Sequence, residues 1–358
     1  MEFANPDDYE IAARELLSQT SYDYIAGGSD DEFTLRDNRA AFERWRLRPR
    51  VLRGVGTRDL TTTILGQKVS FPVCIAPTAL HQLAHPEGEL ATARAAGAAG
   101  VVAVMSTFGS YSMEEVAAVA TGPRWFQLYW YKDRALTESL ITRARDSGYQ
   151  AIVLTADAPV LGRRERDVRN RFAPPPGVSF RNFETATNRE LKRGEGSSLA
   201  AYVSAQAEAD LTWKDVDWLA SFAKLPVLVK GILHPDDARL AAEHGAAGVV
   251  VSNHGGRQLD GALSGIDALP DVVEVASQHR LEVLVDGGFR RGTDVLKALA
   301  LGAKAALIGR PVIWGLAVNG EAGVKATLDL LRLELDLAMG LAGCPDVASI
   351  PRDLVRRL

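Results

Sequence analysis

The stretch Gly248-Val249-Val250-Val251-Ser252-Asn253-His254-Gly255-Gly256-Arg257-Gln258-Leu259-Asp260 changes character in its middle. Its first four residues form an apolar run typical of a buried strand in a parallel sheet. An imidazole and a guanidinium then follow, three residues apart, on a loop with two glycines. A histidine can take a proton from an alcohol, and an arginine can hold a carboxylate through two parallel hydrogen bonds. The stretch therefore predicts a strand that ends in a site for chemistry beside a carboxylate. The loop of this stretch, taken alone, is equally typical of an ordinary turn. The rest of the chain must therefore show whether it forms a functional site.

Short β-rich runs alternate with amphipathic stretches along most of the chain. The runs are residues 73–76, 101–106, 125–130, 151–155, 227–230, 248–251, 282–285 and 305–308, and the helical stretches include 88–99, 113–120, 136–147, 235–243 and 292–301. Eight such units close a (β/α)8 TIM barrel. A doubly wound open sheet is the alternative. This alternative is less well supported, because the Gly-x-Gly-x-x-Gly motif of dinucleotide-binding sheets does not follow the first run.

Polar residues stand at or just after the end of every predicted strand. They are Thr78, Ser106, Gln127, Tyr129, Thr155, Asp157, Lys230, Ser252, His254, Arg257, Asp286, Arg290, Gly309 and Arg310, counting the glycine turn of the last strand. In a barrel these ends converge on one face, where the active site lies. Each residue alone is also consistent with a strand end that meets solvent. Their recurrence around the whole barrel favours a functional site.

The last two strands are followed by glycine-rich turns that open helices, at residues 286–292 and 308–311. Barrels commonly bind phosphate there, because backbone N–H groups at helix N-termini face the anion. Arg290 and Arg310 would add charge-assisted hydrogen bonds. A cofactor that carries phosphate is therefore expected beside His254.

Two segments lie outside the repeating units. Residues 1–65 form an N-terminal extension with a helical start at 7–19, and residues 172–210 form a long insertion after the fourth strand. A long insertion at the catalytic face is typical of a lid. We expect one domain over residues 1–358, with Tyr202 as a further contact from the lid.

The overall composition narrows the class of protein. The chain has 358 residues, a formal net charge of −4 and two cysteines. The acidic balance argues against nucleic acid as a partner, and Cys74 and Cys344 do not suggest a disulfide framework. No signal peptide or apolar span is recognisable, so a cytoplasmic protein with no membrane partner and no metal site is expected. The C-terminal helix, near residues 324–341, is rich in leucine and would pack on the barrel or on a neighbour.

The motifs together resemble the FMN-dependent (S)-2-hydroxy acid oxidases, which include glycolate oxidase, lactate oxidase and their mandelate-oxidising relatives. The resemblance runs almost end to end, through residues 22–28, 75–79, 84–88, 127–129, 155–157, 162–164, 230–231, 252–260, 286–292 and 309–311. The segment 252–260 is its most specific part. The resemblance implies FMN as the cofactor and a homotetramer as the assembly.

The resemblance also implies how FMN is held. The isoalloxazine ring would meet the backbone of Ala76, Pro77, Thr78 and Ala79, and its polar edge would meet Ser106, Gln127 and Thr155. Lys230 would lie near N1 and the C2 oxygen, where its charge favours the anionic reduced flavin. The ribityl chain and the phosphate would contact Ser252, Asp286, Gly288, Arg290, Gly309 and Arg310.

On the substrate side, the resemblance places the carboxylate between Arg257 and Arg164, with help from the Tyr24 hydroxyl. Tyr129 and His254 would face the substrate hydroxyl, and His254 would act as the general base. Asp157 would stabilise the imidazolium; ordinary capping of the strand end is the alternative for this residue.

Phe108 follows the second strand, where plant-type glycolate oxidases carry Trp. The smaller ring leads us to expect L-lactate as the main substrate, with glycolate and larger 2-hydroxy acids also oxidised. Mandelate stays possible, because Leu80, Leu161 and Tyr202 could shape a wider pocket. Oxygen is the expected electron acceptor, with hydrogen peroxide as product; small Ala79 would let it approach.

Other functions stay open on sequence alone. A flavin dehydrogenase of lactate or mandelate, which passes electrons to another acceptor, is the first alternative. An isopentenyl-type isomerase would need ligands for a metal and a diphosphate in place of the carboxylate clamp. A catalytically silent scaffold barrel is hard to reconcile with His254, Lys230 and Arg257 together.

Overall fold

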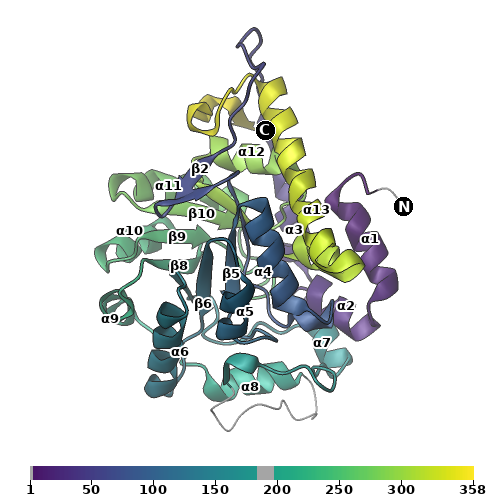
Figure 1. Ribbon diagram of the computed structural model, residues 1–358. Helices are drawn as coiled ribbons and strands as arrows, with labels where there is room; N and C mark the ends of the chain where they lie inside the picture. The colour runs from purple at the N-terminus through teal and green to yellow at the C-terminus, as the bar shows by residue number, and fades with distance from the viewer. Residues whose placement is uncertain (1–2, 184–196) are drawn as a thin grey trace.

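The computed structural model describes residues 3–183 and 197–358, and its centre is a closed barrel of eight parallel strands (Figure 1). The strands, in chain order, are β4 (Val73–Ile75), β5 (Val102–Ser106), β6 (Arg124–Leu128), β7 (Ile152–Thr155), β8 (Val227–Ile232), β9 (Gly248–Val251), β10 (Glu282–Asp286) and β11 (Ala305–Ile308). Each strand pairs with its neighbours in sequence, and β11 returns to pair with β4. The predicted (β/α)8 barrel is confirmed, and the open sheet is wrong.

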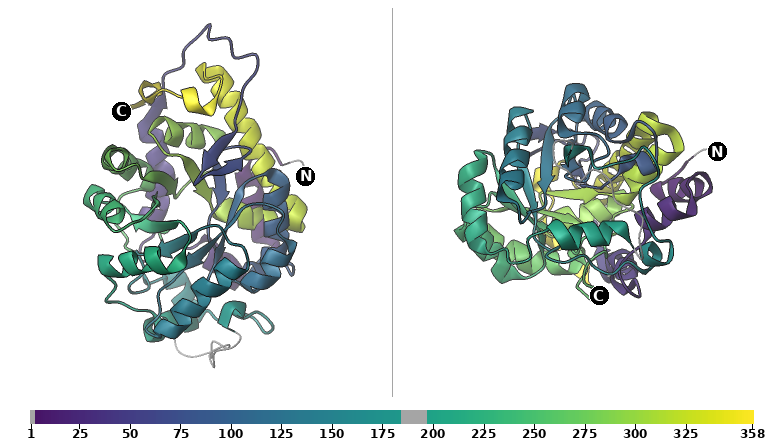
Figure 2. Two further views of the ribbon diagram at one scale, coloured as in Figure 1. Left: turned by 60° about the vertical axis from the view of Figure 1, so that its left-hand side comes forward. Right: turned by 90° about the horizontal axis from the view of Figure 1, so that it is seen from below.

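Helices connect successive strands and surround the barrel (Figure 2). Those that follow the strands are α4 (Gly88–Ala99), α5 (Met113–Val119), α6 (Arg134–Asp146), α7 (Glu165–Arg169), α8 (Ser198–Gln206), α9 (Trp213–Ala223), α10 (Pro235–Glu243), α11 (Gly265–Gln278), α12 (Gly292–Ala300) and α13 (Arg310–Ala342). The predicted helices 88–99 and 235–243 have the bounds of α4 and α10. The glycine-rich turns 286–292 and 308–311 do open helices, α12 and α13.

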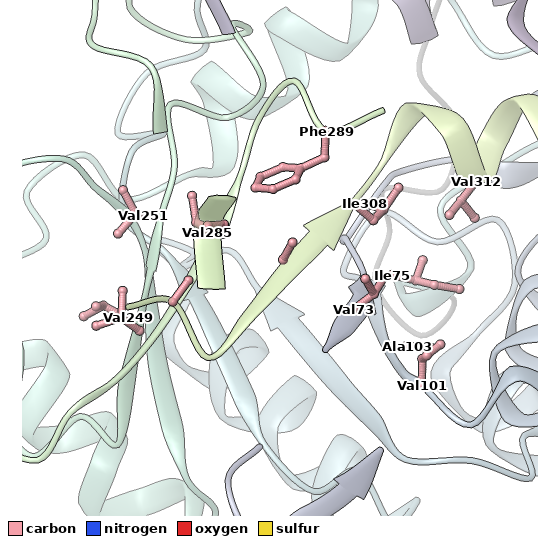
Figure 3. Packing of buried hydrophobic residues seen from close by; sticks show 14 of the residues in the cluster. Val73, Ile75, Val101, Ala103, Val249, Val251, Val285, Phe289, Ile308 and Val312 are labelled. Carbon is pink, nitrogen blue, oxygen red and sulfur yellow. The ribbon is translucent and has the colours of Figure 1, made fainter. Parts of the chain in front are cut away.

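The apolar residues of the strands divide between two cores. Val249 and Val251 of β9 belong to the cluster between the strands and the helices, part of which Figure 3 shows. Val250, between them, belongs to a second cluster inside the barrel. Successive side chains of a strand point to opposite faces, so a strand buried on both faces is apolar throughout. This accounts for the unbroken apolar runs in the sequence.

A hairpin closes one end of the barrel. Strands β2 (Thr62–Ile64) and β3 (Gln67–Val69) pair antiparallel and insert Ile64 and Val69 into the interior cluster. The indole N–H of Trp125, in the barrel, donates to Gln67 Oε1 at 3.1 Å. The other end, where the strands terminate, is left to carry a site.

The N-terminal extension contains more structure than the helix predicted at 7–19. It forms α1 (Pro6–Leu16), α2 (Gln19–Ala26), α3 (Phe33–Ala40) and β1 (Trp45–Leu47), and β1 pairs with β12 (Val355–Arg357). The predicted helix ends early because Ser18 caps a new one: its side chain accepts from the N–H of Ser21. Figure 1 shows α1 beside α13.

The predicted lid, 172–210, is described only in part. It contains a short 3-10 helix, η3 (Arg181–Phe183), and α8, whereas residues 184–196 lie outside the described residues. In residues 3–183 and 197–358, no helix combines the length and the apolar character that crossing a membrane requires.

Helix α13 contains the predicted C-terminal helix but begins earlier and is kinked at Asn319 and Gly320. Its two halves touch through the backbones of Gly315 and Gly323. A Cβ atom added to Gly323 would lie 1.9 Å from the carbonyl oxygen of Gly315.

We therefore predict that Gly323→Ala lowers the free energy of unfolding by about 2 kcal/mol or more, because the two halves must move apart. Gly56→Ala is the matched control, since its Cβ would meet nothing within 4 Å. The control should change stability by less than about 0.5 kcal/mol. Urea unfolding measures both, and equal stability of the two variants would contradict the predicted clash.

Candidate active site

A deep pocket lies at the ends of the barrel strands, on the side where α7 and α8 lie in Figure 1. It encloses about 1170 Å³, including the part open to solvent. It is lined by residues from the strand ends, the following loops, α2 and α8: Tyr24, Ile25, Ala76, Pro77, Thr78, Ala79, Ser106, Phe108, Tyr129, Ala158, Leu161, Arg164, Val203, Lys230, His254, Gly255, Arg257, Asp286, Gly287, Gly288, Phe289, Arg290, Leu307, Ile308, Gly309, Arg310, Pro311 and Ile313.

Polar side chains form a layer at the floor of this pocket, and their positions follow from the alternation of inward and outward side chains along each strand. Each of its members stands two residues after an apolar residue of the interior cluster and so points inward as well. The pairs are Val104 and Ser106, Trp125 and Gln127, Val153 and Thr155, Leu228 and Lys230, Val250 and Ser252, and Leu284 and Asp286. The barrel thus changes from an apolar interior to a polar face within one step of two residues.

Lys230 is the cation at the centre of this layer. It is 3% exposed, its ammonium donates to Ser252 Oγ at 2.9 Å, and it lies 3.4 Å from Asp286 Oδ2. Burial lowers the pKa of this amine, but the carboxylates of Asp286 and Asp157 raise it by more, so the net shift is upward. Lys230 therefore stays charged. Asp286 Oδ1 is buried without a hydrogen-bond partner among the described residues.

Ser106, Gln127 and Thr155 form a hydrogen-bonded row across three strands. The Ser106 hydroxyl donates to Gln127 Oε1 at 3.1 Å, and the Gln127 amide donates to Thr155 Oγ1 at 2.9 Å. Ser106 lines the pocket, whereas Gln127 and Thr155 do not. In this structure the two latter residues support the wall rather than form it.

His254 is held in a strained backbone conformation. Its φ is 59°, in the left-handed region that non-glycine residues rarely adopt, and Gly255 and Gly256 follow with φ of 63° and 75°. The N–H of His254 is tied to Ser252 Oγ at 3.0 Å. Strain of this kind persists where the surroundings enforce it and is concentrated at functional sites.

The ring of His254 lies between a carboxylate and a phenol. Nδ1 is 2.8 Å from Asp157 Oδ1, and Nε2 is 3.4 Å from the Tyr129 hydroxyl. Because a carboxylate only accepts, Nδ1 carries the proton, and the lone pair of Nε2 faces the Tyr129 hydroxyl. Asp157 does not line the pocket and acts on it through His254.

The protonation states of His254 and Asp157 suit a general base before it has taken up a proton. Burial lowers the pKa of His254 and outweighs the opposing effect of Asp157. Burial alone would raise the pKa of Asp157, but His254 and Lys230 bring it below its ordinary value. The resting state is thus a neutral imidazole beside an ionised carboxylate. Burial also raises the pKa of the Tyr129 phenol, which stays protonated.

Two guanidinium groups lie in the same pocket. Arg164 is 7% exposed, and its Nε is buried without a hydrogen-bond partner among residues 3–183 and 197–358. Burial and, to a smaller extent, the nearby charge of Arg257 together lower its pKa to about 10. Arg257 donates through Nη1 to the carbonyl oxygens of Tyr24 and Gly27, at 2.7 and 2.9 Å. In the described part of the chain, neither arginine forms an ion pair with a carboxylate within 4.0 Å.

Tyr24 belongs to α2 and brings the N-terminal extension into the site. Its ring stacks on Phe172 with centroids 4.2 Å apart, and the guanidinium of Arg257 lies 5.1 Å from the ring centre. Burial raises the pKa of Tyr24, so the hydroxyl is protonated and can donate to an anion.

The other end of the pocket, beside α12 and α13, has the predicted basic turns. Arg290 lies 3.4 Å from Asp7 Oδ1 of α1. Arg310 donates to three backbone carbonyls, of Ile25, Gly27 and Gly255, at 2.9–3.0 Å. It therefore joins the N-terminal extension to the His254 loop, besides adding positive charge to the pocket; its predicted contact with phosphate stays a prediction.

The residues present fit FMN. One wall is backbone and small side chains at 76–79, a charged lysine and an unpartnered Asp286 oxygen face the interior, and glycine-rich helix starts with two arginines lie at the end where phosphate is expected. Isoalloxazine requires an apolar slot with polar groups at its edge, and phosphate requires N–H groups and cations.

Most of the predicted site residues meet in this pocket. Gln127, Thr155, Ser252 and Asp157 stand behind its surface. Sequence reasoning missed several apolar lining residues, among them Ile25, Ala158, Val203, Phe289, Leu307 and Ile313. Leu307 and Ile308 lie at the end of a recognised strand, so the barrel itself signals them. Val203 has no such signal, because it comes from the insertion.

Comparisons with known proteins agree with this geometry. The FMN-dependent dehydrogenase family matches residues 13–357. Glycolate oxidase of Spinacia oleracea is 51% identical over 352 residues, covering 98% of this chain and 95% of that protein. L-lactate oxidase of a Nostoc species is 52% identical over 348 residues, covering 96% and 95%.

Among solved structures, mandelate oxidase with (S)-4-hydroxymandelic acid superposes with a TM-score of 0.94 and 46% identity, over 99% of this chain and 98% of that one. The family match spans nearly the whole chain, and these relatives share about half of its residues. The chain therefore belongs to the FMN-dependent dehydrogenase family and is an FMN-dependent oxidoreductase.

Proposed function

We propose that this protein oxidises small (S)-2-hydroxy acids to 2-oxo acids, with L-lactate as the main substrate and oxygen as the electron acceptor. The observation that carries the proposal is the pair Arg164 and Arg257. Both lie in the pocket that holds His254, and neither forms an ion pair with a carboxylate in the described part of the chain. Two cations brought together out of water are unfavourable unless an anion joins them.

A substrate carboxylate supplies that anion. Within the described residues, Arg164 Nε is buried without a partner, and Arg257 uses only Nη1 for backbone contacts. Both side chains thus keep N–H donors for a ligand, and Tyr24 offers a hydroxyl beside them. Charge-assisted hydrogen bonds from guanidinium to carboxylate are strong and fix orientation as well as position.

His254 removes a proton from the bound substrate. Its lone pair is on Nε2, next to the Tyr129 hydroxyl, so both groups face the substrate from the same side. Taking up the proton turns the ring into an imidazolium, which the ionised Asp157 at 2.8 Å stabilises. The FMN of this family supplies the two-electron acceptor for the reaction. Lys230 is charged and buried, and it would stabilise negative charge on the reduced flavin.

The apolar side of the pocket suits a small substituent on the substrate. Phe108, Ala158, Leu161 and Val203 line it. The Phe108 ring is fixed by Phe180 at 4.7 Å between centroids. A methyl group gains free energy by leaving water against such a surface, about 0.8 kcal/mol for each buried carbon, whereas glycolate offers none.

Oxygen as the acceptor is supported by the names of three relatives, which are oxidases of glycolate, L-lactate and mandelate, whereas another solved relative is named (S)-mandelate dehydrogenase. Ala79 lines the pocket and is small, which leaves room beside the cofactor. A homotetramer, which the resemblance implies, and the cytoplasmic location expected from the sequence complete the proposal.

Spectroscopy with three substrates tests the function. We expect L-lactate to bleach the flavin absorbance of the purified protein without oxygen, and air to restore it with formation of hydrogen peroxide. The kcat/KM for L-lactate should equal or exceed that for glycolate, and Phe108→Trp should lower the lactate-to-glycolate ratio because the larger ring fills the methyl site.

Each outcome of this experiment leads to a different conclusion. Bleaching that persists in air would make the protein a dehydrogenase. A clear preference for glycolate would overturn the lactate assignment, and no bleaching with lactate, glycolate or mandelate would overturn the proposed reaction.

His254→Ala should retain FMN but slow flavin reduction by about 10²–10⁴-fold, because the base is lost. His244→Ala is the matched control: His244 also contacts a carboxylate, Asp217 at 2.8 Å, but lies outside the pocket. Stopped-flow absorbance measures both. Equal rates in the two variants would exclude His254 as the base.

The same step has a pH dependence. In the wild type, kcat/KM should rise with pH as His254 loses its proton, with an apparent pKa below the ordinary value of about 6.5. Asp157→Asn should move this pKa lower still, because the carboxylate is what favours the charged ring.

Arg257→Lys should raise KM by roughly tenfold or more, since an ammonium cannot make the two parallel contacts of a guanidinium. Arg163→Lys is the control, because Arg163 is exposed and pairs with Glu165 outside the pocket. Steady-state kinetics with L-lactate compare the two. An unchanged KM in Arg257→Lys would remove this residue from the carboxylate site.

A further inference from the structure

A buried histidine outside the catalytic set contacts the wall of the pocket. His81 begins η2 (His81–Leu83), between β4 and α4, and is 3% exposed. Its Nε2 lies 2.5 Å from Oγ1 of Thr78, a pocket residue, and its Nδ1 lies 3.0 Å from Oγ1 of Thr92. Both ring nitrogens therefore face hydroxyl groups, which can donate or accept.

A third contact fixes the direction of these hydrogen bonds. The Thr92 hydroxyl also lies 3.3 Å from the carbonyl oxygen of Gly88, which can only accept. When Thr92 donates to Gly88, its oxygen accepts from His81 Nδ1–H. His81 Nε2 then accepts the proton of Thr78. This direction satisfies all three contacts, whereas the reverse leaves the contact with Gly88 without a proton.

The surroundings keep the ring neutral. Burial lowers the pKa of His81, and the nearby Glu89 carboxylate and the backbone of Thr78 only partly oppose this shift. That carboxylate is occupied elsewhere: it accepts the N–H of His81 at 3.1 Å, and the N–H and hydroxyl of Ser110 at 2.9 and 2.6 Å. A neutral ring has one N–H, so a single tautomer fits this site.

The position of His81 is set by its backbone rather than by its ring. Glu89 holds the His81 N–H, and the N–H of Leu80, at a φ of 56°, donates to the carbonyl oxygen of Phe108 at 3.0 Å. These bonds do not involve the imidazole. The imidazole is thus available for a hydrogen bond with the Thr78 hydroxyl.

We propose that His81 is a positioning residue, which makes the Thr78 hydroxyl a hydrogen-bond acceptor toward the FMN pocket. The one proton of that hydroxyl is directed to His81, so only lone pairs face the ligand. The wall at Thr78 then recognises a hydrogen-bond donor of the ligand, an N–H or a hydroxyl, and disfavours a carbonyl oxygen. This inference rests on the proposed place of Thr78 in the FMN site.

The tautomer is measured directly by long-range ¹H–¹⁵N NMR of the holoenzyme labelled at histidine. The His81 signals are assigned by their loss in His81→Gln. We expect a neutral ring with its proton on Nδ1. A proton on Nε2, or a charged ring, would overturn the proposal without touching the proposed oxidase function, which flavin bleaching tests separately.

A double-mutant cycle tests the effect on the ligand, with FMN release from diluted holoenzyme followed by flavin fluorescence. His81→Leu and Thr78→Val should each weaken FMN binding by roughly 3- to 10-fold. The double variant should bind no more weakly than Thr78→Val, because His81 acts only through that hydroxyl. Additive effects would assign His81 a merely structural role.

His81→Gln provides the conservative rescue, because its amide can accept from Thr78 and donate to Thr92. It should bind FMN within about twofold of the wild type. If His81→Leu fails to fold, Thr92→Val takes its place in the cycle, with Thr92→Ser as its control. Thr92→Val should allow the reversed tautomer and weaken FMN binding, and an unchanged tautomer in it would contradict the proposed direction.

Discussion

The site depends on one constraint: in a closed barrel, every second side chain of a strand must point inward. Below the face the inward positions are apolar, as in Val250 and Leu228, and they fill the barrel between the β2–β3 hairpin and the pocket. Two residues later the same direction places Ser252 and Lys230 at the floor of the site. A shift of one residue would send Lys230 into the apolar layer under the helices, where a charge is costly. The register of the barrel and the composition of the site are therefore one property.

The charges above this floor are arranged for anions. Lys230 is balanced within the protein by Asp286 and Asp157, so it adds little net charge. Among the described residues, Arg164 and Arg257 have no carboxylate within 4.0 Å; the buried Asp167 attracts both from farther away, and burial and the charge of Arg257 still outweigh it at Arg164. A cluster like this is stable as a fold only because the rest of the barrel is well packed. It becomes favourable locally when an anion enters, and this links substrate recognition to the chemistry that takes place beside it.

The barrel strands could be predicted because each is a short apolar run with its own turn, and the polar residues at their ends were found by the same reasoning. Whether each of those residues lines the pocket or lies behind its surface could not be predicted. Gln127 and Thr155 support Ser106 through hydrogen bonds that exist only because three strands lie side by side. Likewise, Arg310 looks like a phosphate ligand in sequence, but its donors reach carbonyls of a distant segment. His81 gave no signal, since nothing local marks a histidine as buried between two threonines.

The N-terminal extension holds the proposed base and the proposed carboxylate site at a fixed separation. Ser29 N–H donates to the carbonyl oxygen of Gly256, and Arg310 bridges the carbonyls of Gly27 and Gly255. These bonds fasten the end of α2, which carries Tyr24, to the strained loop that carries His254. The left-handed conformation of that loop costs free energy, and bonds from outside the barrel maintain it. The extension thus forms part of the pocket, because its hydrogen bonds fix Tyr24 relative to the loop that carries the proposed base, His254.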